Sequence, residues 1–246
     1  MIKGVILDYG GTIDTNGVHW AEVLWKEYQA LELPISKEAF REAYIYGERT
    51  MGKQPLIQPS DNFRQVLLIK SQLQLQHLNE QGILDSTKYP LETYAQYLAD
   101  RGYQYALKTI ESARNIVGKL KMKYKLALVS NFYGNIHAIL KDFGLLCSFE
   151  NIIESAVVGV RKPDPAIFSL GVNELGLQPN EIVVIGDSYT KDIIPAHSIG
   201  CHTIWLKGIG WDEKEKNDET LPDYIISNLA YAPQTIENLE NKLKYV

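Results

Sequence analysis

The stretch VILDYGGT, residues 5–12, decides the fold. Its apolar run, residues 5–7, does not alternate with polar residues, which predicts a strand buried on both faces, as in a parallel sheet. Asp8 follows the strand directly, and Gly10 and Gly11 allow the chain to turn sharply there. Such a turn brings backbone N–H groups close to an anion. The stretch therefore predicts a buried parallel strand with a carboxylate at its carboxyl end.

Two further apolar runs, residues 126–129 and 182–185, have the same character. Helical patterns lie around and between them, over residues 109–120, 135–143 and 166–175. Alternation of strands and helices implies right-handed crossovers and helices on both faces of a sheet. We therefore predict an α/β fold with a doubly wound, parallel, Rossmann-like sheet.

Each apolar run is followed by a polar residue: Asp8 after the first, Ser130 after the second and Asp187 after the third. In an open parallel sheet, ligands bind beyond the carboxyl ends of the strands. One such residue could simply cap the next helix. Three at the same edge of one sheet predict a functional site.

The segment 17–101 differs from the rest because it contains no comparable strand run. Its apolar residues recur at helical spacing, with helices expected from near Trp20, after Ser36, from near Ser60 to Gly82, and from Leu91 to Arg101. We predict a helical cap domain over residues 17–101, inserted into an α/β core domain of residues 1–16 and 102–246. Its position just after Asp8 would hang it over the carboxyl edge of the sheet.

Two later segments add chemistry to this edge. Lys162 lies in GVRKPDP, residues 159–165, where two prolines stiffen the loop, Asp164 is a candidate N-cap and Pro165 the expected first helical residue. Asp187 and Asp192 lie in GDSYTKD, residues 186–192. Carboxylates and a backbone carbonyl can hold Mg²⁺, while a lysine and hydroxyl groups can neutralise phosphoryl oxygens.

These segments resemble the four motifs of the haloacid dehalogenase-like hydrolases, in order: DYGGT at Asp8, VSN at Ser130, KPDP at Lys162, and GDSYTKD at Asp187 and Asp192. The resemblance covers nearly the whole chain, including a helical cap after the first motif. It implies a hydrolase that acts on a small phosphorylated molecule.

The resemblance also implies a role for each matching residue. Asp8 would attack phosphorus and form an aspartyl-phosphate. Mg²⁺ would be bound by Asp8, Asp187 and the Gly10 carbonyl, with Asp192 in support. The phosphate would be held by residues of the first three motifs: Gly11, Thr12, Ser130, Asn131 and Lys162. Lys162 would in addition restrain the charge of Asp8, and the cap would exclude water and select the leaving group.

The chain departs from the phosphatase pattern at Gly10, where phosphatases of this family carry a second aspartate that serves as general acid and base. General acid-base catalysis is typically worth about 10²–10⁴ in rate. We do not expect Asp14 to replace it, because that residue should lie at the junction of core and cap. Three alternatives follow: a phosphatase with another proton donor or slow turnover, a phosphonoacetaldehyde hydrolase-like enzyme with Lys53 as a Schiff-base lysine, or an idle binding or regulatory protein on the same fold.

Composition sets the remaining expectations. The 246 residues are 45% apolar and carry a net charge of −5, which argues against a nucleic-acid or membrane-binding surface. No segment approaches the roughly 20 apolar residues of a membrane helix, the first residues lack a signal-peptide pattern, and the two cysteines suit a reducing compartment. We expect a cytoplasmic protein and make no prediction of its oligomeric state. The lysine run at residues 119–125 and the loop 211–216 are expected to be solvated.

Overall fold

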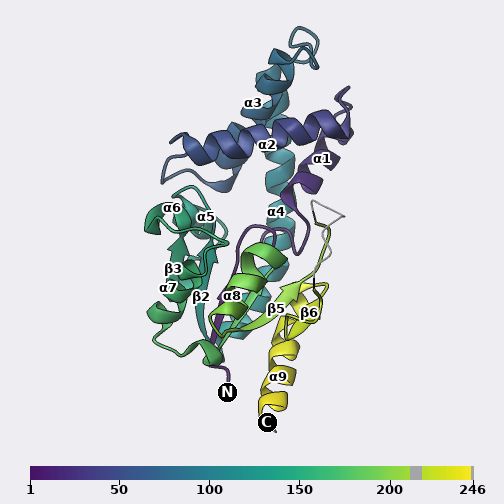
Figure 1. The fold of residues 1–246 in the computed structure, drawn as a ribbon. Coiled ribbons are helices and arrows are strands. Elements are labelled where there is room, and N and C mark those ends of the chain that lie inside the picture. The colour runs from purple at the N-terminus through teal and green to yellow at the C-terminus, as the bar shows by residue number, and fades with distance from the viewer. Residues whose placement is uncertain (211–217, 245–246) are drawn as a thin grey trace.

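The computed structural model describes residues 1–210 and 218–244, so the loop expected at 211–216 lies outside the described residues. Within them the strands form one sheet in the order β3-β2-β1-β4-β5-β6, with every neighbouring pair parallel (Figure 1). Their bounds are β1 (Gly4–Leu7), β2 (Lys125–Ser130), β3 (Asn151–Glu154), β4 (Ile182–Gly186), β5 (His202–Leu206) and β6 (Tyr224–Ile226). The doubly wound parallel sheet predicted from the sequence is confirmed.

The three predicted strands are β2, β1 and β4, the centre of the sheet. Alternate residues of each strand enter different clusters of the core, because successive side chains point to opposite faces. Val5 and Leu7 pack into the cluster that contains α4 (Leu91–Lys121), α5 (Ile136–Asp142) and α9 (Ala232–Leu243), whereas Ile6 packs into the other. That second cluster contains α7 (Ala166–Leu175) and α8 (Ile194–Ser198). Burial on both faces explains why these strands read as uninterrupted apolar runs.

Residues 20–80 form three helices, α1 (Trp20–Ala30), α2 (Lys37–Lys53) and α3 (Phe63–Glu80). Together with the part of α4 up to residue 101 they form what we call the helical lobe, which stands beyond the carboxyl ends of the strands (top of Figure 1). Ser36 caps α2, as predicted, by accepting a hydrogen bond from the Ala39 N–H at 3.2 Å. α3 begins after Asn62, which forms a capping box with Gln65, rather than near Ser60.

The prediction of separate helices over 91–101 and 109–120 is wrong, because α4 is one helix of 31 residues. Its buried face continues at helical spacing through Leu98, Gly102, Ala106 and Ile110 without interruption. Gly102 does not break the helix; it lets Leu67 approach closely, since a Cβ there would lie 3.2 Å from a methyl group of that leucine. The predicted boundary between residues 101 and 102 falls inside α4, and the division into two domains stays a prediction.

The short helix α6 (Ser155–Val158) and four single turns complete the described elements: Leu146–Ser148, Pro179–Glu181, Tyr189–Ile193 and Leu229–Tyr231. α7 begins at Ala166, with Pro165 in the N-cap position rather than inside the helix; the Asp164 carboxylate still accepts the Ala166 N–H at 2.9 Å.

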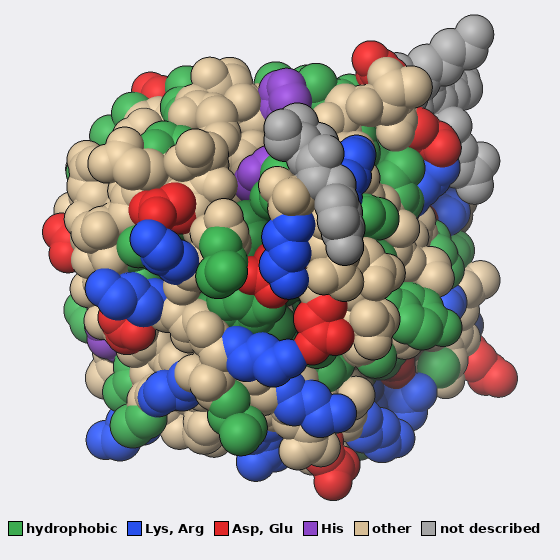
Figure 2. Space-filling view, turned by 90° about the horizontal axis from the view of Figure 1, so that it is seen from below, with side chains coloured by type: hydrophobic (Ala, Val, Ile, Leu, Met, Phe, Trp, Pro, Cys, Tyr) green, Lys and Arg blue, Asp and Glu red, His purple; other side chains and the backbone are tan. Residues whose placement is uncertain are grey.

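At the end of the core away from the helical lobe, basic and acidic side chains are interspersed on the surface (Figure 2). The lysines of the 119–125 run are exposed, as predicted. Lys123 pairs with Glu237, and Lys3 pairs with Glu181 at 2.5 Å. Such exposed pairs contribute little to stability.

Candidate active site

The carboxyl ends of the central strands bring three of the predicted residues into direct contact. The Nζ of Lys162 lies 2.6 Å from Oδ1 of Asp8 and 2.6 Å from Oδ1 of Asp192. All three side chains are almost completely buried, at 3%, 8% and 2% exposure. Lys162 therefore donates two charge-assisted hydrogen bonds inside the protein, where such bonds are strong.

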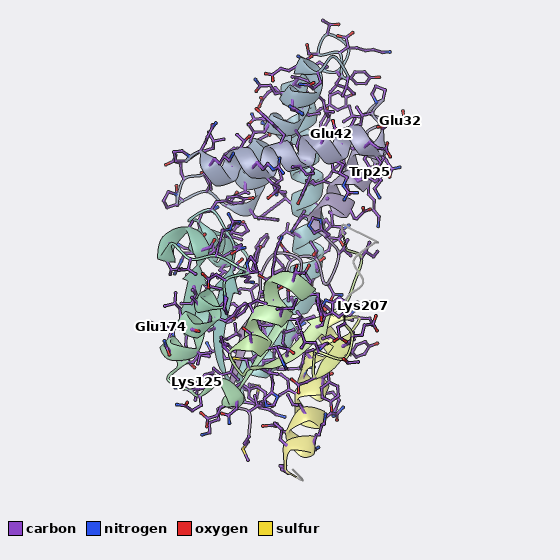
Figure 3. All side chains as sticks on the ribbon, in the orientation of Figure 1. Trp25, Glu32, Glu42, Lys125, Glu174 and Lys207 are labelled. Carbon is purple, nitrogen blue, oxygen red and sulfur yellow. The ribbon has the colours of Figure 1, made fainter. Side chains whose placement is uncertain are left out.

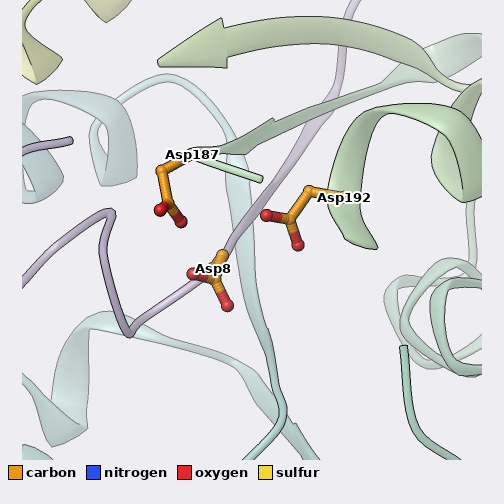
Figure 4. Close-up of side chains that lie close together, drawn as sticks. All are labelled: Asp8, Asp187 and Asp192. Carbon is orange, nitrogen blue, oxygen red and sulfur yellow. The ribbon is translucent and has the colours of Figure 1, made fainter. Parts of the chain in front are cut away.

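Asp187 completes a cluster of carboxylates with Asp8 and Asp192. One oxygen from each residue lies within 4.8 Å of those of the other two, and the side chains converge on a common space in Figure 4. The Thr12 hydroxyl lies 3.2 Å from Oδ2 of Asp8 and 3.3 Å from Oδ1 of Asp187, and can donate to either. Residues from the first, third and fourth motifs thus form one site.

Burial and mutual repulsion disturb the protonation of this cluster. Burial, with the nearby Asp192 charge, raises the pKa of Asp8 to about 6, although Lys162 opposes the shift. Burial also raises the pKa of Asp187 well above its ordinary value, and Asp8 and Asp192 add to the effect. Burial alone would lower the pKa of Lys162, but the charges of Asp192 and Asp8 and their hydrogen bonds outweigh it and raise the pKa. Asp8 and Asp187 are therefore weaker acids than a free aspartate.

These residues fit a divalent cation. Three carboxylates and one ammonium leave a net formal charge of −2, which one Mg²⁺ would neutralise. All the donors are hard oxygen atoms, which Mg²⁺ prefers, and their spacing allows a shared ion. Burial is the main cause of the raised pKa values of Asp8 and Asp187, and repulsion from the neighbouring carboxylates adds to it.

Two glycines are required by this packing. Gly11 has φ +96°, and a Cβ on it would lie 2.3 Å from a carboxylate oxygen of Asp187. A Cβ on Gly186 would lie 2.5 Å from the Asp192 carboxylate. Both distances are shorter than any real contact, so the carboxylates occupy space that only glycine leaves free.

Backbone contacts hold the aspartates of the fourth motif in place. The Trp205 indole on β5 donates to the carbonyl oxygen of Asp187 at 2.8 Å. Asp192 is brought back toward the sheet by the single turn Tyr189–Ile193, and its Oδ2 accepts the Ser188 N–H at 3.0 Å.

Asp14 ties the first motif to the helical lobe. It is fully buried and accepts hydrogen bonds from the Gly11 N–H and the Trp20 indole, both at 2.7 Å. Burial raises the pKa of Asp14 to about 7, although these two hydrogen bonds oppose the shift. Both carboxylate oxygens are engaged, so the structure gives Asp14 a positioning role. The Gly11 N–H, which we predicted to bind phosphate, here donates to Asp14.

The second motif holds the lysine loop. The Asn131 side chain donates to the carbonyl of Lys162 at 3.0 Å and accepts its N–H at 2.9 Å. Asn131 thus fixes the backbone of Lys162, and its predicted contact with phosphate stays a prediction. Ser130 is buried at the end of β2. Glu154, at the end of β3, supports the loop that follows β2 by accepting the Gly134 N–H at 2.6 Å.

Gly10 is exposed, in contrast to its neighbours in the first motif. No atom lies within 4 Å of the position a Cβ would take, and its φ is not in the left-handed region. The structure therefore has room at this position for the side chain that phosphatases of the family carry. Asp14 does not take the place of that side chain, because it is bound to Gly11 and Trp20 instead. The sequence analysis had not expected Asp14 to replace it.

Lys53 does not join the cluster. It is exposed at the end of α2, in a groove of about 490 Å³ formed by residues of α2 and Gln54. None of the carboxylates of the cluster lines this groove. The depressed pKa that a Schiff-base lysine needs comes from burial or a neighbouring cation, and the exposed position provides no burial.

The sequence analysis missed a polar group where the helical lobe meets the core. Glu48 of α2 pairs with Lys70 of α3 at 2.5 Å and accepts a hydrogen bond from the Tyr133 hydroxyl of the core at 2.8 Å. A signal was present in the sequence: Lys70 lies at a buried position of α3, between the apolar residues Leu67 and Leu75. A charged residue on the apolar face of a helix indicates a buried partner.

Comparison with known proteins identifies the family of the chain. Residues 2–200 match a family described as haloacid dehalogenase-like hydrolase. The chain therefore belongs to the haloacid dehalogenase-like hydrolases, as the motifs indicated.

Among curated proteins, haloacid dehalogenase-like hydrolase domain-containing protein 3 of Danio rerio is 32% identical over 114 residues, 46% of each chain. The glyceraldehyde 3-phosphate phosphatase of Pyrococcus furiosus is 33% identical over 145 residues, which cover 55% of this chain and 56% of that protein. The chain thus spans about half the length of the curated relatives it matches.

Solved structures share the fold. A dehalogenase superposes with a TM-score of 0.61 at 18% identity, covering 94% of this chain and 95% of that one. A HAD-hydrolase of Bacillus subtilis bound to magnesium superposes with a TM-score of 0.58 at 17% identity, covering 95% and 98%. Among the described residues, no helix is both long and apolar enough to cross a membrane.

Proposed function

We propose that this hydrolase is a Mg²⁺-dependent phosphatase of small phosphorylated metabolites, with Asp8 as its nucleophile. The observation that carries the proposal is that the Asp8 carboxylate contacts the Lys162 ammonium and belongs, with Asp187 and Asp192, to a carboxylate cluster suited to Mg²⁺. The similarity to proteins named glyceraldehyde 3-phosphate phosphatase supports a phosphoric monoester as the substrate. We place the protein in the cytoplasm, since Cys147 and Cys201 are both free.

In this proposal Asp8, Asp187 and the Gly10 carbonyl would hold Mg²⁺, with Asp192 in support, and Mg²⁺ bound there would supply positive charge for the phosphoryl oxygens. Asp8 attacks phosphorus, its bond to phosphorus forms as the ester P–O bond breaks, and the alcohol oxygen leaves with the electron pair. Lys162 keeps Asp8 ionised and then balances charge on the phosphoryl group. Water next attacks the aspartyl-phosphate, which releases phosphate and restores Asp8.

Because residue 10 is glycine, we expect two steps of this cycle to be slow: departure of the alcohol and attack of water on the aspartyl-phosphate. Glycine has no carboxyl group at that position to protonate the departing oxygen or to activate the water. General acid-base catalysis contributes about 10²–10⁴ in rate. We therefore expect slow turnover of alkyl phosphates. An ester whose leaving group is a stable anion should still phosphorylate Asp8, because that group leaves without a proton.

A rapid-quench assay with p-nitrophenyl phosphate and Mg²⁺ tests this proposal. The wild type should release nearly one equivalent of p-nitrophenolate in a burst and then turn over slowly. Gly10→Asp should accelerate the slow phase by about 10²-fold or more, because the structure has room for the new carboxylate. Gly10→Ala is the matched control and should behave as the wild type.

The other outcomes separate the alternatives. Absence of a burst and of turnover in both the wild type and Gly10→Asp would indicate an idle binding or regulatory protein. A phosphonoacetaldehyde hydrolase-like reaction would appear as borohydride trapping at Lys53, which its exposed position argues against. The helical lobe would act as the cap in each case, since it faces the sheet edge that carries Asp8.

A further inference from the structure

A second cavity of the protein lies where the chain passes from the core into the helical lobe. It has a volume of about 320 Å³, which is enough for a small metabolite. Its wall is formed by the segment after the first motif, by the middle of α4 and by the loop that follows β6, within residues 13–18, 105–116 and 228–229. None of the charged residues of the candidate active site belongs to this wall.

The wall of this cavity carries a positive charge. Lys108 of α4 is the one charged residue among the described residues that line the cavity. In the described part of the chain its ammonium has no ion-pair or hydrogen-bond partner. An anion in the cavity would therefore meet an ammonium whose charge no carboxylate already balances.

The two amide side chains of the wall present donors rather than acceptors. Oδ1 of Asn16 accepts the Leu229 N–H at 2.8 Å. Oδ1 of Asn228 accepts the Ala230 N–H at 2.9 Å. Because each amide oxygen is engaged with the backbone, the NH₂ group of each amide is the part that remains for a ligand. Such groups bind oxygen acceptors.

Hydroxyl groups of the wall add further donors. Thr15 is 1% exposed, yet its hydroxyl has no hydrogen-bond partner among the described residues. A buried hydroxyl without a partner is unfavourable, and an acceptor atom in the adjoining cavity would supply one. Tyr105 and Ser112 on the same wall also carry hydroxyl groups that have no hydrogen-bond partner within residues 1–210 and 218–244.

We infer that this cavity is a second binding site, for a small hydroxycarboxylate. One ammonium balances the single charge of a carboxylate, whereas a phosphate monoester carries a charge of about −1.5 to −2 and would leave part of it unbalanced. The amide groups would donate to the oxygen atoms of the ligand, and the wall hydroxyls can also accept from its hydroxyl groups. This site does not depend on the proposed function, because none of the residues of the candidate active site takes part in it.

Titration of the ¹⁵N-labelled full chain with glycerate, followed by two-dimensional NMR, tests the inference. Glyceramide is the matched control ligand, because it has the same carbon chain and hydroxyl groups but no charge. EDTA is present throughout, so that no Mg²⁺ recruits the ligand to the carboxylate cluster. The side-chain amide signals of Asn16 and Asn228 should shift with glycerate. Glyceramide should bind about 10- to 100-fold more weakly, the value of a hydrogen bond to a charged group.

Replacing Lys108 by Gln should reduce the ratio of the two affinities to near one, because it removes the charge that distinguishes the ligands. Lys125→Gln is the matched control and should leave the ratio unchanged. Lys125 lies at the start of β2, on the part of the core away from the helical lobe, and is labelled in Figure 3. Thr15→Val keeps the shape of the side chain and should weaken binding of both ligands by about 2- to 10-fold, the value of a neutral hydrogen bond.

Equal affinities for glycerate and glyceramide, signals of Asn16 and Asn228 that do not shift, or an unchanged ratio in Lys108→Gln would overturn the inference. Inorganic phosphate is the second anion to test. Phosphate that shifts the same two signals at lower concentration than glycerate would overturn the assignment to a carboxylate, whereas weaker binding of phosphate at these signals supports it.

Discussion

The Lys162 ammonium lies 2.6 Å from the Asp8 carboxylate, although 154 positions separate them in the sequence. The contact exists because β1 ends at the edge of the sheet where the loop before α7 lies. Asn131, in the loop directly after β2, fixes the Lys162 backbone there, and β2 is the neighbour of β1. The same ammonium also contacts Asp192, so it is the one cation in direct contact with the carboxylate cluster among the described residues.

Replacing Lys162 by Met should destabilise the fold in the absence of Mg²⁺. Removal of one partner from a buried ion pair costs about 3–5 kcal/mol, because the other charge stays buried. For a chain of this size we expect a decrease in Tm of about 10 °C, measured by scanning calorimetry. Addition of Mg²⁺ should restore part of the loss, since the ion supplies positive charge. A Tm unaffected by the substitution would show that the pair is not buried as described.

Gly10 and Gly11 should respond in opposite ways to the same substitution. Gly11→Ala forces a Cβ into the Asp187 carboxylate and a side chain into a left-handed backbone conformation. We expect a loss of at least about 2 kcal/mol in the free energy of unfolding and weaker Mg²⁺ binding. Gly10→Ala meets no atom and should change the unfolding free energy by less than about 0.5 kcal/mol. Denaturant unfolding of the two variants checks this, and equal effects would contradict the described loop.

Substitution of Asp187 by Asn should remove most of the Mg²⁺ affinity, because it deletes a charged ligand from the cluster. In the wild type, Mg²⁺ should raise Tm as a bound ligand does, and EDTA should abolish turnover. In Asp187→Asn the dependence of Tm on Mg²⁺ should largely disappear, whereas the exposed Glu111→Gln on α4 should retain it. Turnover that persists in EDTA would contradict a requirement for Mg²⁺.

We expect the protein to lose stability in mild acid, because the partly buried His19 is harder to protonate in the folded state than in the unfolded state. Burial lowers its pKa to about 4; Lys191 and Lys70 add to this effect, while Glu48 and Glu22 oppose it. Because the folded pKa lies below the unfolded value near 6.5, the stabilisation is complete above pH 6.5 and is lost as pH falls toward 4.

Between pH 7.5 and 5, His19 should therefore account for about 2 kcal/mol of the decrease in unfolding free energy. His19→Asn keeps a good N-cap for α1 and should show a smaller decrease over this range. His197→Asn, at an exposed position, should follow the wild type. Chemical denaturation at both pH values measures the difference, and parallel profiles for wild type and His19→Asn would contradict the assignment.

The centre of the sheet could be predicted because β1, β2 and β4 are buried on both faces and therefore appear as short apolar runs. β3, β5 and β6 were missed since their sequences, such as HTIWL, mix polar and apolar residues near the sides of the sheet. The helices expected over residues 91–101 and 109–120 are parts of one helix, because the buried face of α4 continues through Gly102 and Ala106. The close contact of Leu67 with Gly102 is visible only in the tertiary structure.

The site was predictable to the extent that its residues follow strands. Asp8 and Asp187 come directly after strands, and Lys162 and Asp192 were found through their motifs. Asn131 both donates to the Lys162 carbonyl and accepts the Lys162 N–H, and Asp14 is buried. Both features depend on loop geometry, which local sequence patterns do not encode. The Glu48–Lys70 pair was missed because it joins two helices of the lobe whose mutual packing the sequence does not specify.

Covalent phosphorylation of Asp8 is the central claim, and acid quenching followed by peptide mapping by mass spectrometry tests it most directly. The wild type, mixed with p-nitrophenyl phosphate and Mg²⁺ and quenched during the burst, should carry one phosphoryl group on Asp8. The Asp8→Asn protein should carry none and should show no burst. A phosphoryl group on another residue, or hydrolysis that continues in Asp8→Asn, would contradict the nucleophilic role of Asp8.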